Sequence, residues 1–249
     1  MKFEKVLFHT SFRELAMNSL FSILELKKTG LKEIVLTSVI SREEVGFVPY
    51  GGYMKEEEER LRDVARVRFE DWQQKIAEHG VDSKIRVVVG SPNKRIIEVA
   101  EEEQVDLVVA GRTKRSLMEK VYVGTHILDL LRRSAVPTLM SKYMVEFEWQ
   151  EESLTRVNDH IFQRPMLATD WSGPSENALE SMVALKGLAE EVLISHVIDD
   201  KVAKGRDGEG LAKLEEKSQQ RLKGYCRRLE DKGLTTEHHL AYGQPAPEI

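Results

Sequence analysis

Short apolar runs alternate with longer amphipathic segments along most of the 249-residue chain. This alternation is typical of βαβ units, in which helices cover both faces of a parallel sheet. The near-continuous apolar run Glu33–Ile40 (EIVLTSVI) indicates a central strand of such a sheet. Between Glu56 and His79 apolar residues recur every three or four positions, which predicts one long amphipathic helix. The pattern as a whole predicts an α/β fold.

The first part of the chain contains a complete set of these elements, and we predict residues 1–142 to form a first, five-stranded repeat. Strands are predicted at Lys5–Phe8, Glu33–Ile40, Ser83–Val89, Asp106–Ala110 and Val136–Ser141. Helices are predicted at Arg13–Lys28, Glu56–His79 and Asn93–Glu103, with a further helix beginning near Thr125. A glycine-rich loop at 41–54 separates the second strand from the long helix.

The same order of elements restarts in the second part of the chain, after an acidic stretch at 143–163. We interpret this stretch as a linker that is too irregular for a strand or helix of the preceding kind. Residues 164–249 then form the second repeat, because matching Gly-x-Pro turns at Gly90 and Gly243 follow the third strand of each repeat. Its strands are predicted at Pro165–Thr169, Glu191–Ile198 and Thr235–Ala241, and its helices at Ser175–Ala189 and Leu211–Lys232.

The second repeat is predicted to be partial, because the sequence holds no counterpart of residues 97–142 after its third strand. A parallel sheet without its last two strands exposes an edge and apolar helix faces unless another chain covers them. Either the natural protein continues beyond the sequence given, or it has a partial second domain. Of these two interpretations we favour the longer natural sequence.

Composition narrows the possible partners and compartments. The chain carries 37 basic and 42 acidic residues, a formal net charge of -5, which argues against a nucleic-acid backbone as the main partner. The single cysteine, Cys226, excludes an intramolecular disulfide and a thiol cluster for a metal. No stretch approaches the ~20 apolar residues of a membrane span, and the N-terminus lacks the apolar core of a secretion signal. We therefore expect a cytoplasmic protein without a membrane partner.

The loop after the fourth predicted strand, Gly111–Thr125, has features of a phosphate site. In open α/β sheets, ligands lie beyond the carboxyl ends of the strands, where this loop begins. Gly124 leaves room for an anion, and Thr125 lies at a helix start, where unpaired N–H groups and the helix dipole favour phosphate. Arg112 and Lys114 add positive charge. The same residues are also compatible with two turn glycines, an ordinary helix cap and solvated cations.

These elements and this loop resemble the ATP-binding universal stress proteins, whose loop is spaced as Gly, two residues, Gly, nine residues, Gly and then Ser or Thr. Gly111, Gly124 and Thr125 match, whereas Lys114 stands in place of the second glycine; the segment Ala168–Ala178 (ATDWSGPSENA) is also similar to the family. The resemblance implies a Rossmann-like open parallel sheet with strand order 3-2-1-4-5, repeated twice. It also implies that the loop holds the phosphates of ATP or AMP, with Mg²⁺ as an accompanying ion.

The resemblance further implies an aspartate at the end of the first strand, in contact with the adenosine part of the nucleotide. The first repeat has Thr10 and Ser11 at this point, and only the second repeat keeps the aspartate, as Asp170. Val39 and Val197, near the ends of the second strands, are implied to flank the adenine, although both positions also suit plain sheet core. Lys114 would either fill the phosphate space or pair with a phosphate as a point charge. Each repeat therefore lacks part of the family pattern.

Two functions remain open on this basis. One is an adenine-nucleotide sensor or regulator of a stress response, in which ATP or AMP orders the loop at Arg112–Val123 and changes a surface offered to an unknown protein partner. The other is a nucleotide-independent dimeric interaction module, in which Ser11 and Lys114 mark a degenerate site. In both cases the family resemblance implies pairing through the fifth strand, Val136–Ser141, within a homodimer or between the two repeats as a pseudo-dimer.

Catalysis finds little support in the sequence. The histidines show no metal-ligand spacing, and the chain has neither a complete P-loop nor a Gly-x-Ser-x-Gly elbow. A third alternative is an enzyme of the wider adenine-nucleotide hydrolase group that activates a substrate with ATP. Such enzymes have a first-strand loop rich in Ser and Gly, which Phe8–Arg13 does not provide. We therefore expect a binding protein and not an enzyme.

Overall fold

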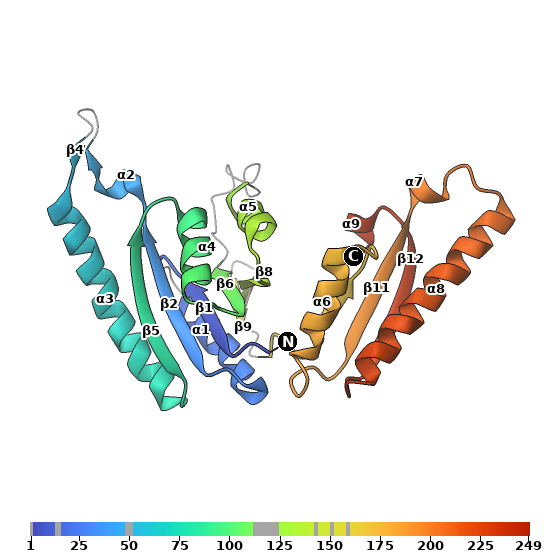
Figure 1. Cartoon of the computed structure of the whole chain (residues 1–249), viewed down its shortest axis with the longest axis horizontal. Coiled ribbons are helices and arrows are strands. Elements are labelled where there is room, and N and C mark those ends of the chain that lie inside the picture. Colours follow the sequence, from blue (N-terminus) through green and yellow to red (C-terminus); the bar gives the residue numbers. More distant parts are fainter. Residues whose placement is uncertain are drawn as a thin grey trace. The chain divides into compact units, whose positions relative to one another are not determined.

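The computed structural model describes residues 2–12, 16–47, 52–111, 125–141, 144–149, 152–157 and 160–249. The chain divides into two compact units, of which one is Phe3–Asp159 and the other consists mainly of His160–Ile249. Each unit contains a parallel sheet with helices packed against it (Figure 1). The fold is thus α/β in both parts of the chain, as the hydrophobic pattern predicts.

The first unit is built on a five-stranded parallel sheet with the order β5-β2-β1-β6-β7. Counted along the chain within this sheet, the order is 3-2-1-4-5, which confirms the prediction. The direction of winding reverses between β1 and β6, so these two strands form the switch point of the sheet. The strands are β1 (Lys5–His9), β2 (Glu33–Ile40), β5 (Asp82–Val89), β6 (Leu107–Gly111) and β7 (Thr138–Ser141).

Helices cover both faces of this sheet, because successive strand residues point to opposite sides. On one face Leu7 and Val35 pack with Ile96 of α4 and Leu130 of α5. On the other face Phe8 meets Trp72 of α3 with their ring centroids 6.2 Å apart. The helices are α1 (Ala16–Ile23), the 3-10 helix η1 (Leu24–Thr29), α3 (Lys55–Glu78), α4 (Pro92–Glu102) and α5 (Thr125–Arg133).

Two segments differ from the sequence-based prediction in the first unit. The single helix predicted at Arg13–Lys28 is an eight-residue α-helix followed by a 3-10 helix, which Gly30 ends with φ +115°. The predicted loop at 41–54 holds the short helix α2 (Arg42–Val45) and the antiparallel strands β3 (Gly46–Phe47) and β4 (Gly52–Tyr53). The helix α2 forms because Ser41 provides a capping box for it.

The stretch expected to be an irregular linker contains a β-hairpin. Its strands β8 (Met144–Trp149) and β9 (Glu152–Val157) pair antiparallel, with Met144 opposite Val157. The sequence of β8, MVEFEW, alternates apolar and polar residues, which is the period of a strand. The interpretation of 143–163 as a stretch without strands was therefore wrong for 144–149 and 152–157.

The second unit has a three-stranded parallel sheet in the order β10-β11-β12. Its core lies between the sheet and two helices, where Leu167 and Ile194 pack with Leu179 of α6 and Leu222 of α8. The strands are β10 (Met166–Ala168), β11 (Val192–Asp199) and β12 (Thr236–Gly243), and the helices are α6 (Gly173–Val183), α7 (Asp200–Ala203), α8 (Gly208–Glu230) and α9 (Pro245–Glu248).

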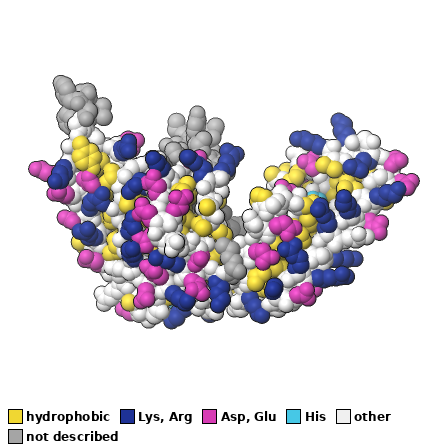
Figure 2. Space-filling model, in the orientation of Figure 1, with side chains coloured by type: hydrophobic (Ala, Val, Ile, Leu, Met, Phe, Trp, Pro, Cys, Tyr) yellow, Lys and Arg dark blue, Asp and Glu magenta, His cyan; other side chains and the backbone are white. Residues whose placement is uncertain are grey.

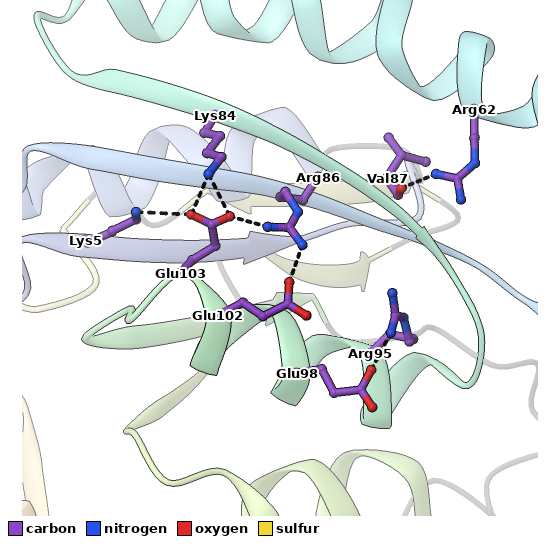
Figure 3. A network of polar contacts seen from close by, with 9 residues as sticks. All are labelled: Lys5, Arg62, Lys84, Arg86, Val87, Arg95, Glu98, Glu102 and Glu103. Carbon is purple, nitrogen blue, oxygen red and sulfur yellow. Dashed lines mark hydrogen bonds and ion pairs between the residues drawn. The ribbon is translucent and has the colours of Figure 1, made fainter.

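Side chains of α3 hydrogen-bond the backbone of β5, the strand at one edge of the five-stranded sheet. Arg62 donates from Nη1 to the carbonyl oxygen of Val87, as Figure 3 shows. Gln73 donates from Nε2 to the carbonyl oxygen of Ser83 over 2.9 Å. Arg62 is in turn held by Glu58, 2.6 Å from its Nε. Two carbonyl groups of an edge strand, which usually have no partner within a sheet, are thus satisfied from within the chain.

A buried carboxylate, Glu103, joins the end of α4 to the sheet. Its side chain is 5% exposed, and its oxygens contact Lys5 at 3.3 Å and Lys84 at 2.8 Å. Arg86 pairs with both Glu103 and the neighbouring Glu102 (Figure 3). Burial acts to raise the pKa of Glu103, but hydrogen bonds from Lys84, Arg86 and Lys5 outweigh it and lower the pKa to about 2. The carboxylate is therefore charged and paired in the folded state.

Candidate functional site

A cavity of about 420 Å³ lies at the carboxyl end of β10 and β11 in the second unit. This is the edge at which open α/β sheets bind their ligands. The sequence-predicted residues Asp170 and Val197 both line it, so the structure brings them together. Its other lining residues are Ala168, Thr169, Ser172, Pro174, Ser175, Ala178, His196, Pro245 and Ile249.

Asp170 is fixed by the first turn of α6. The Ser175 hydroxyl donates to Oδ1 of Asp170 over 2.7 Å, and the backbone N–H of Ser172 donates to the same oxygen over 3.0 Å. Hydrogen bonds from Ser172 and Ser175 lower the pKa of Asp170 to about 2. Both of these bonds end on Oδ1, so Oδ2 keeps its capacity to accept from a ligand. The site thus presents an oriented acceptor that is charged at neutral pH.

Two hydrogen bonds fix the ring of His196 in the wall of the same cavity. Its Nδ1 lies 2.7 Å from the carbonyl oxygen of Thr169, so Nδ1 carries a proton and donates. Its Nε2 lies 3.2 Å from Nε1 of Trp171, an indole nitrogen that only donates, so Nε2 accepts. Both ring nitrogens are therefore used in positioning neighbouring groups. His196 acts as part of the wall of the cavity.

Trp171 has a left-handed backbone, with φ +65°, which is uncommon for a bulky residue. Its N–H donates to Oγ1 of Thr169 over 3.1 Å, and the guanidinium of Arg221 lies 5.1 Å from its ring centroid. The first unit repeats this arrangement: Phe12 has φ +55°, and its N–H donates to Oγ1 of Thr10 over 2.9 Å. The internal repeat therefore extends to the backbone at the end of the first strand.

Sequence reasoning missed the roles of Trp171, His196, Ser172 and Ser175. The Thr-x-aromatic spacing was available in both repeats, at Thr10-Ser11-Phe12 and Thr169-Asp170-Trp171. The serine spacing was also readable, because Ser172 caps α6 by accepting from the N–H of Ser175. The place of His196 depends on the register of β11 against β10, which sequence alone did not provide.

In the first unit, Thr10 and Gly111 lie at the corresponding edge of the sheet. His9 of β1 is paired with Ala110 of β6. The residues that follow them, Thr10 and Gly111, therefore lie at the same edge of the sheet. Thr10 is buried, and Ser11 is exposed at the position equivalent to Asp170. This edge therefore carries a hydroxyl group where the second unit carries a carboxylate.

The other predicted residues of the first unit are only partly placed. Val39 is partly buried and packs against the sheet core. Thr125 begins α5, as predicted for the residue at this helix start. Arg112, Lys114 and Gly124 lie outside the described residues. The predicted phosphate loop thus stays a prediction.

Within the described part of the chain, no group of three or more His, Cys, Asp or Glu side chains is arranged to hold a metal ion. None of the helices in that same part has both the length and the apolar composition needed to cross a bilayer. Figure 2 shows acidic and basic side chains interspersed over the visible face of both units. The surface shown agrees with the small net charge of the sequence.

Comparison with known proteins identifies the family. A model of the universal stress protein family matches residues 2–142. The chain belongs to the universal stress protein family. Among characterised relatives of this family member, the universal stress protein MJ0577 of Methanocaldococcus jannaschii is 25% identical over 154 residues, which cover 56% of this chain and 95% of the relative.

Solved structures are similar to this universal stress protein over both of its units. A universal stress protein from Archaeoglobus fulgidus matches 100% of this chain and 80% of its own, with a TM-score of 0.71 and 20% identity. A putative universal stress protein from Pseudomonas aeruginosa UCBPP-PA14 matches 97% of this chain and 74% of its own, with a TM-score of 0.56 and 16% identity. At these identities the likeness shows a shared fold.

Proposed function

We propose that this universal stress protein binds an adenine nucleotide, ATP or AMP, and acts as a sensor or regulator in a stress response. The observation that carries the proposal is the anchored carboxylate of Asp170 in the same cavity as Val197. The volume of this cavity, about 420 Å³, falls within the range of roughly 300–1,000 Å³ that small-molecule pockets have.

The lining of the cavity fits the adenosine part of the nucleotide. Ala168, Ala178, Val197 and Pro245 supply apolar surface for a purine. Asp170 supplies an acceptor for an amino group or a ribose hydroxyl. Among the residues that the structure describes, no lysine or arginine lines this cavity, and a phosphate close to Asp170 would be repelled. We therefore propose that this cavity recognises adenosine and that the phosphates point away from Asp170.

The same residues support a binding protein over a hydrolase. An effective general base has a pKa near the working pH, whereas hydrogen bonds from Ser172 and Ser175 hold the pKa of Asp170 at about 2. Both nitrogens of His196 are committed to Thr169 and Trp171. Neither group is placed to activate water at neutral pH. On this basis we propose binding without turnover, in a cytoplasmic protein that reports to a protein partner or a second copy of itself.

The exposed Ser11 gives the competing proposal its support. It stands where the second unit has Asp170, so the first unit lacks the carboxylate on which the proposed adenosine contact depends. A nucleotide-independent interaction module would tolerate this loss. The two proposals differ in whether the protein responds to nucleotide at all.

The test is the effect of AMP on unfolding by urea. With free AMP at about 100 times its dissociation constant, wild-type protein should gain about 2.7 kcal/mol in the free energy of unfolding. Asp170→Asn keeps the size of the side chain but removes its charge. Because a hydrogen bond to a charged group contributes about 1.5–3 kcal/mol, the gain should fall to about 1.4 kcal/mol or less at the same AMP concentration.

Asp82→Asn is the matched control, since Asp82 is an exposed aspartate at the start of β5 in the other unit. It should show the full stabilisation by AMP. Equal stabilisation of the wild type and Asp170→Asn would remove Asp170 from the proposed site. No response of the wild type to AMP or ATP would favour the interaction module.

A further inference from the structure

A second cavity, of about 350 Å³, lies in the second unit between the carboxyl end of β11 and helix α8. It shares Asp170, His196, Val197 and Pro245 with the first cavity but extends to different elements, α7 and α8. Much of its wall is apolar or aromatic, contributed by Trp171, Val197, Ile198, Val202, Leu214 and Pro245. An apolar body with little hydrogen-bonding capacity fits such a wall.

The aromatic part of this wall is held in place. Trp171 lies 4.5 Å from His196 and 5.2 Å from Tyr225, measured between ring centroids, and its indole N–H is hydrogen-bonded to His196. Val202, on α7, is 49% exposed although it lines the cavity. A ligand in the cavity would remove this apolar side chain from water without having to order Trp171 first.

Two cations, Lys217 and Arg221, line the α8 side of the cavity one helical turn apart. Figure 2 shows Lys and Arg side chains beside hydrophobic ones on the visible face of the second unit. Arg221 lies over the ring of Trp171, at 5.1 Å. Lys217 has no hydrogen bond or ion pair with any residue that the structure describes. Lys217 is therefore the cation available to a ligand.

Each of the two carboxylates of the wall has one oxygen that accepts from a neutral donor of the chain. Asp170 accepts from the hydroxyl of Ser175 over 2.7 Å. Asp199 caps α7, because its Oδ1 accepts from the N–H of Lys201 over 2.7 Å. Lys217 is thus a charged side chain of this wall that has neither a hydrogen bond nor an ion pair within the described part of the chain, and it lies next to apolar surface. A ligand that matches both features has one negative charge and an apolar body.

We propose that this cavity binds a small amphipathic carboxylate, with its apolar or aromatic body against Trp171, Val202 and Leu214 and its carboxylate at Lys217. This ligand is distinct from the adenine nucleotide of the first cavity. The body of this ligand lies toward α8 and the nucleotide toward α6, so we expect the second unit to bind both at once even though the two cavities share four lining residues.

The test uses 3-phenylpropionate as the probe in isothermal titration calorimetry with the full chain. Wild-type protein should bind it, and Lys217→Gln should raise the dissociation constant about tenfold or more, since a charge-assisted hydrogen bond is lost. Lys223→Gln is the matched control, because Lys223 is an exposed lysine of the same helix outside the cavity. It should leave the dissociation constant unchanged. The uncharged 3-phenylpropanol should bind wild type and Lys217→Gln equally and more weakly than the acid binds wild type.

Several outcomes would overturn the proposal. They are the absence of heat from 3-phenylpropionate, an equal loss of affinity in Lys217→Gln and Lys223→Gln, and equal affinity for acid and alcohol. A repeat titration at saturating AMP separates this site from the nucleotide site. Displacement of the probe by AMP would mean one shared cavity and would also contradict the proposal. If AMP does not bind but the probe does, the nucleotide proposal fails and this one stands.

Discussion

Replacing Glu103 by Gln should lower the free energy of unfolding by about 2–4 kcal/mol at neutral pH, because breaking a buried ion pair leaves its partners uncompensated. Lys5, Lys84 and Arg86 converge on this one carboxylate, whose side chain is only 5% exposed. The amide keeps the shape of the side chain but removes the charge that Lys84 pairs with, and it leaves Lys5 with Glu33 and Arg86 with Glu102 as their remaining partners. Urea unfolding at pH 7 measures the difference.

Glu101→Gln provides the control, since Glu101 is an exposed residue of the same helix. It should change stability by less than about 0.5 kcal/mol, as surface substitutions usually do.

The loss of stability caused by Glu103→Gln should also become smaller at acidic pH. The folded pKa of Glu103 is lowered to about 2 from 4.5, so its contribution is complete above pH 4.5 and disappears as the pH falls toward 2. A loss of stability that does not depend on pH would contradict the electrostatic explanation.

Acidification from pH 7 to pH 5 should cost the protein about 2 kcal/mol of stability through His9 alone. Burial lowers the pKa of this histidine from 6.5 to about 4. Below pH 6.5 the unfolded chain therefore binds a proton that the folded chain does not, and stability falls as the pH falls toward 4. Urea unfolding at pH 7, 6 and 5 gives the slope.

His9→Gln isolates this effect, because an amide does not titrate. The variant should lose about 2 kcal/mol less than the wild type between pH 7 and pH 5. The lowered pKa values of Glu103 and Asp170, both about 2, place their own loss of stability at lower pH, outside this interval. Parallel pH profiles of wild type and His9→Gln would show that His9 titrates alike in the folded and unfolded chain.

Most of the sheet could be predicted from the sequence because its strands are compact apolar runs between amphipathic helices. The second strand, Glu33–Ile40, has the predicted bounds in the structure. The hairpin at 144–157 was missed for an identifiable reason. Its charged and aromatic residues alternate as in a strand, but the sequence between its two strands, Gln-Glu, contains no Asn or Gly of the kind that usually indicates a hairpin.

The sequence allowed us to predict two residues of the candidate site, but not the contacts of their side chains. Asp170 and Val197 follow from the ends of two parallel strands, which meet at one edge of the sheet. The hydrogen bonds that fix Asp170 depend on where α6 begins, and the cationic wall of the second cavity depends on the rotation of α8 about its own axis. The spacing of apolar residues fixes neither the first residue of α6 nor the rotation of α8 accurately enough to place a single side chain.

The contacts of Arg62 and Gln73 with the backbone of β5 occupy hydrogen-bonding groups at this edge of the five-stranded sheet. A strand from another molecule that approached β5 would find Val87 and Ser83 already bonded to side chains. It would have to displace a guanidinium that Glu58 also holds. Growth of the sheet by addition of foreign strands, the usual route to aggregation of open sheets, is therefore opposed at this end.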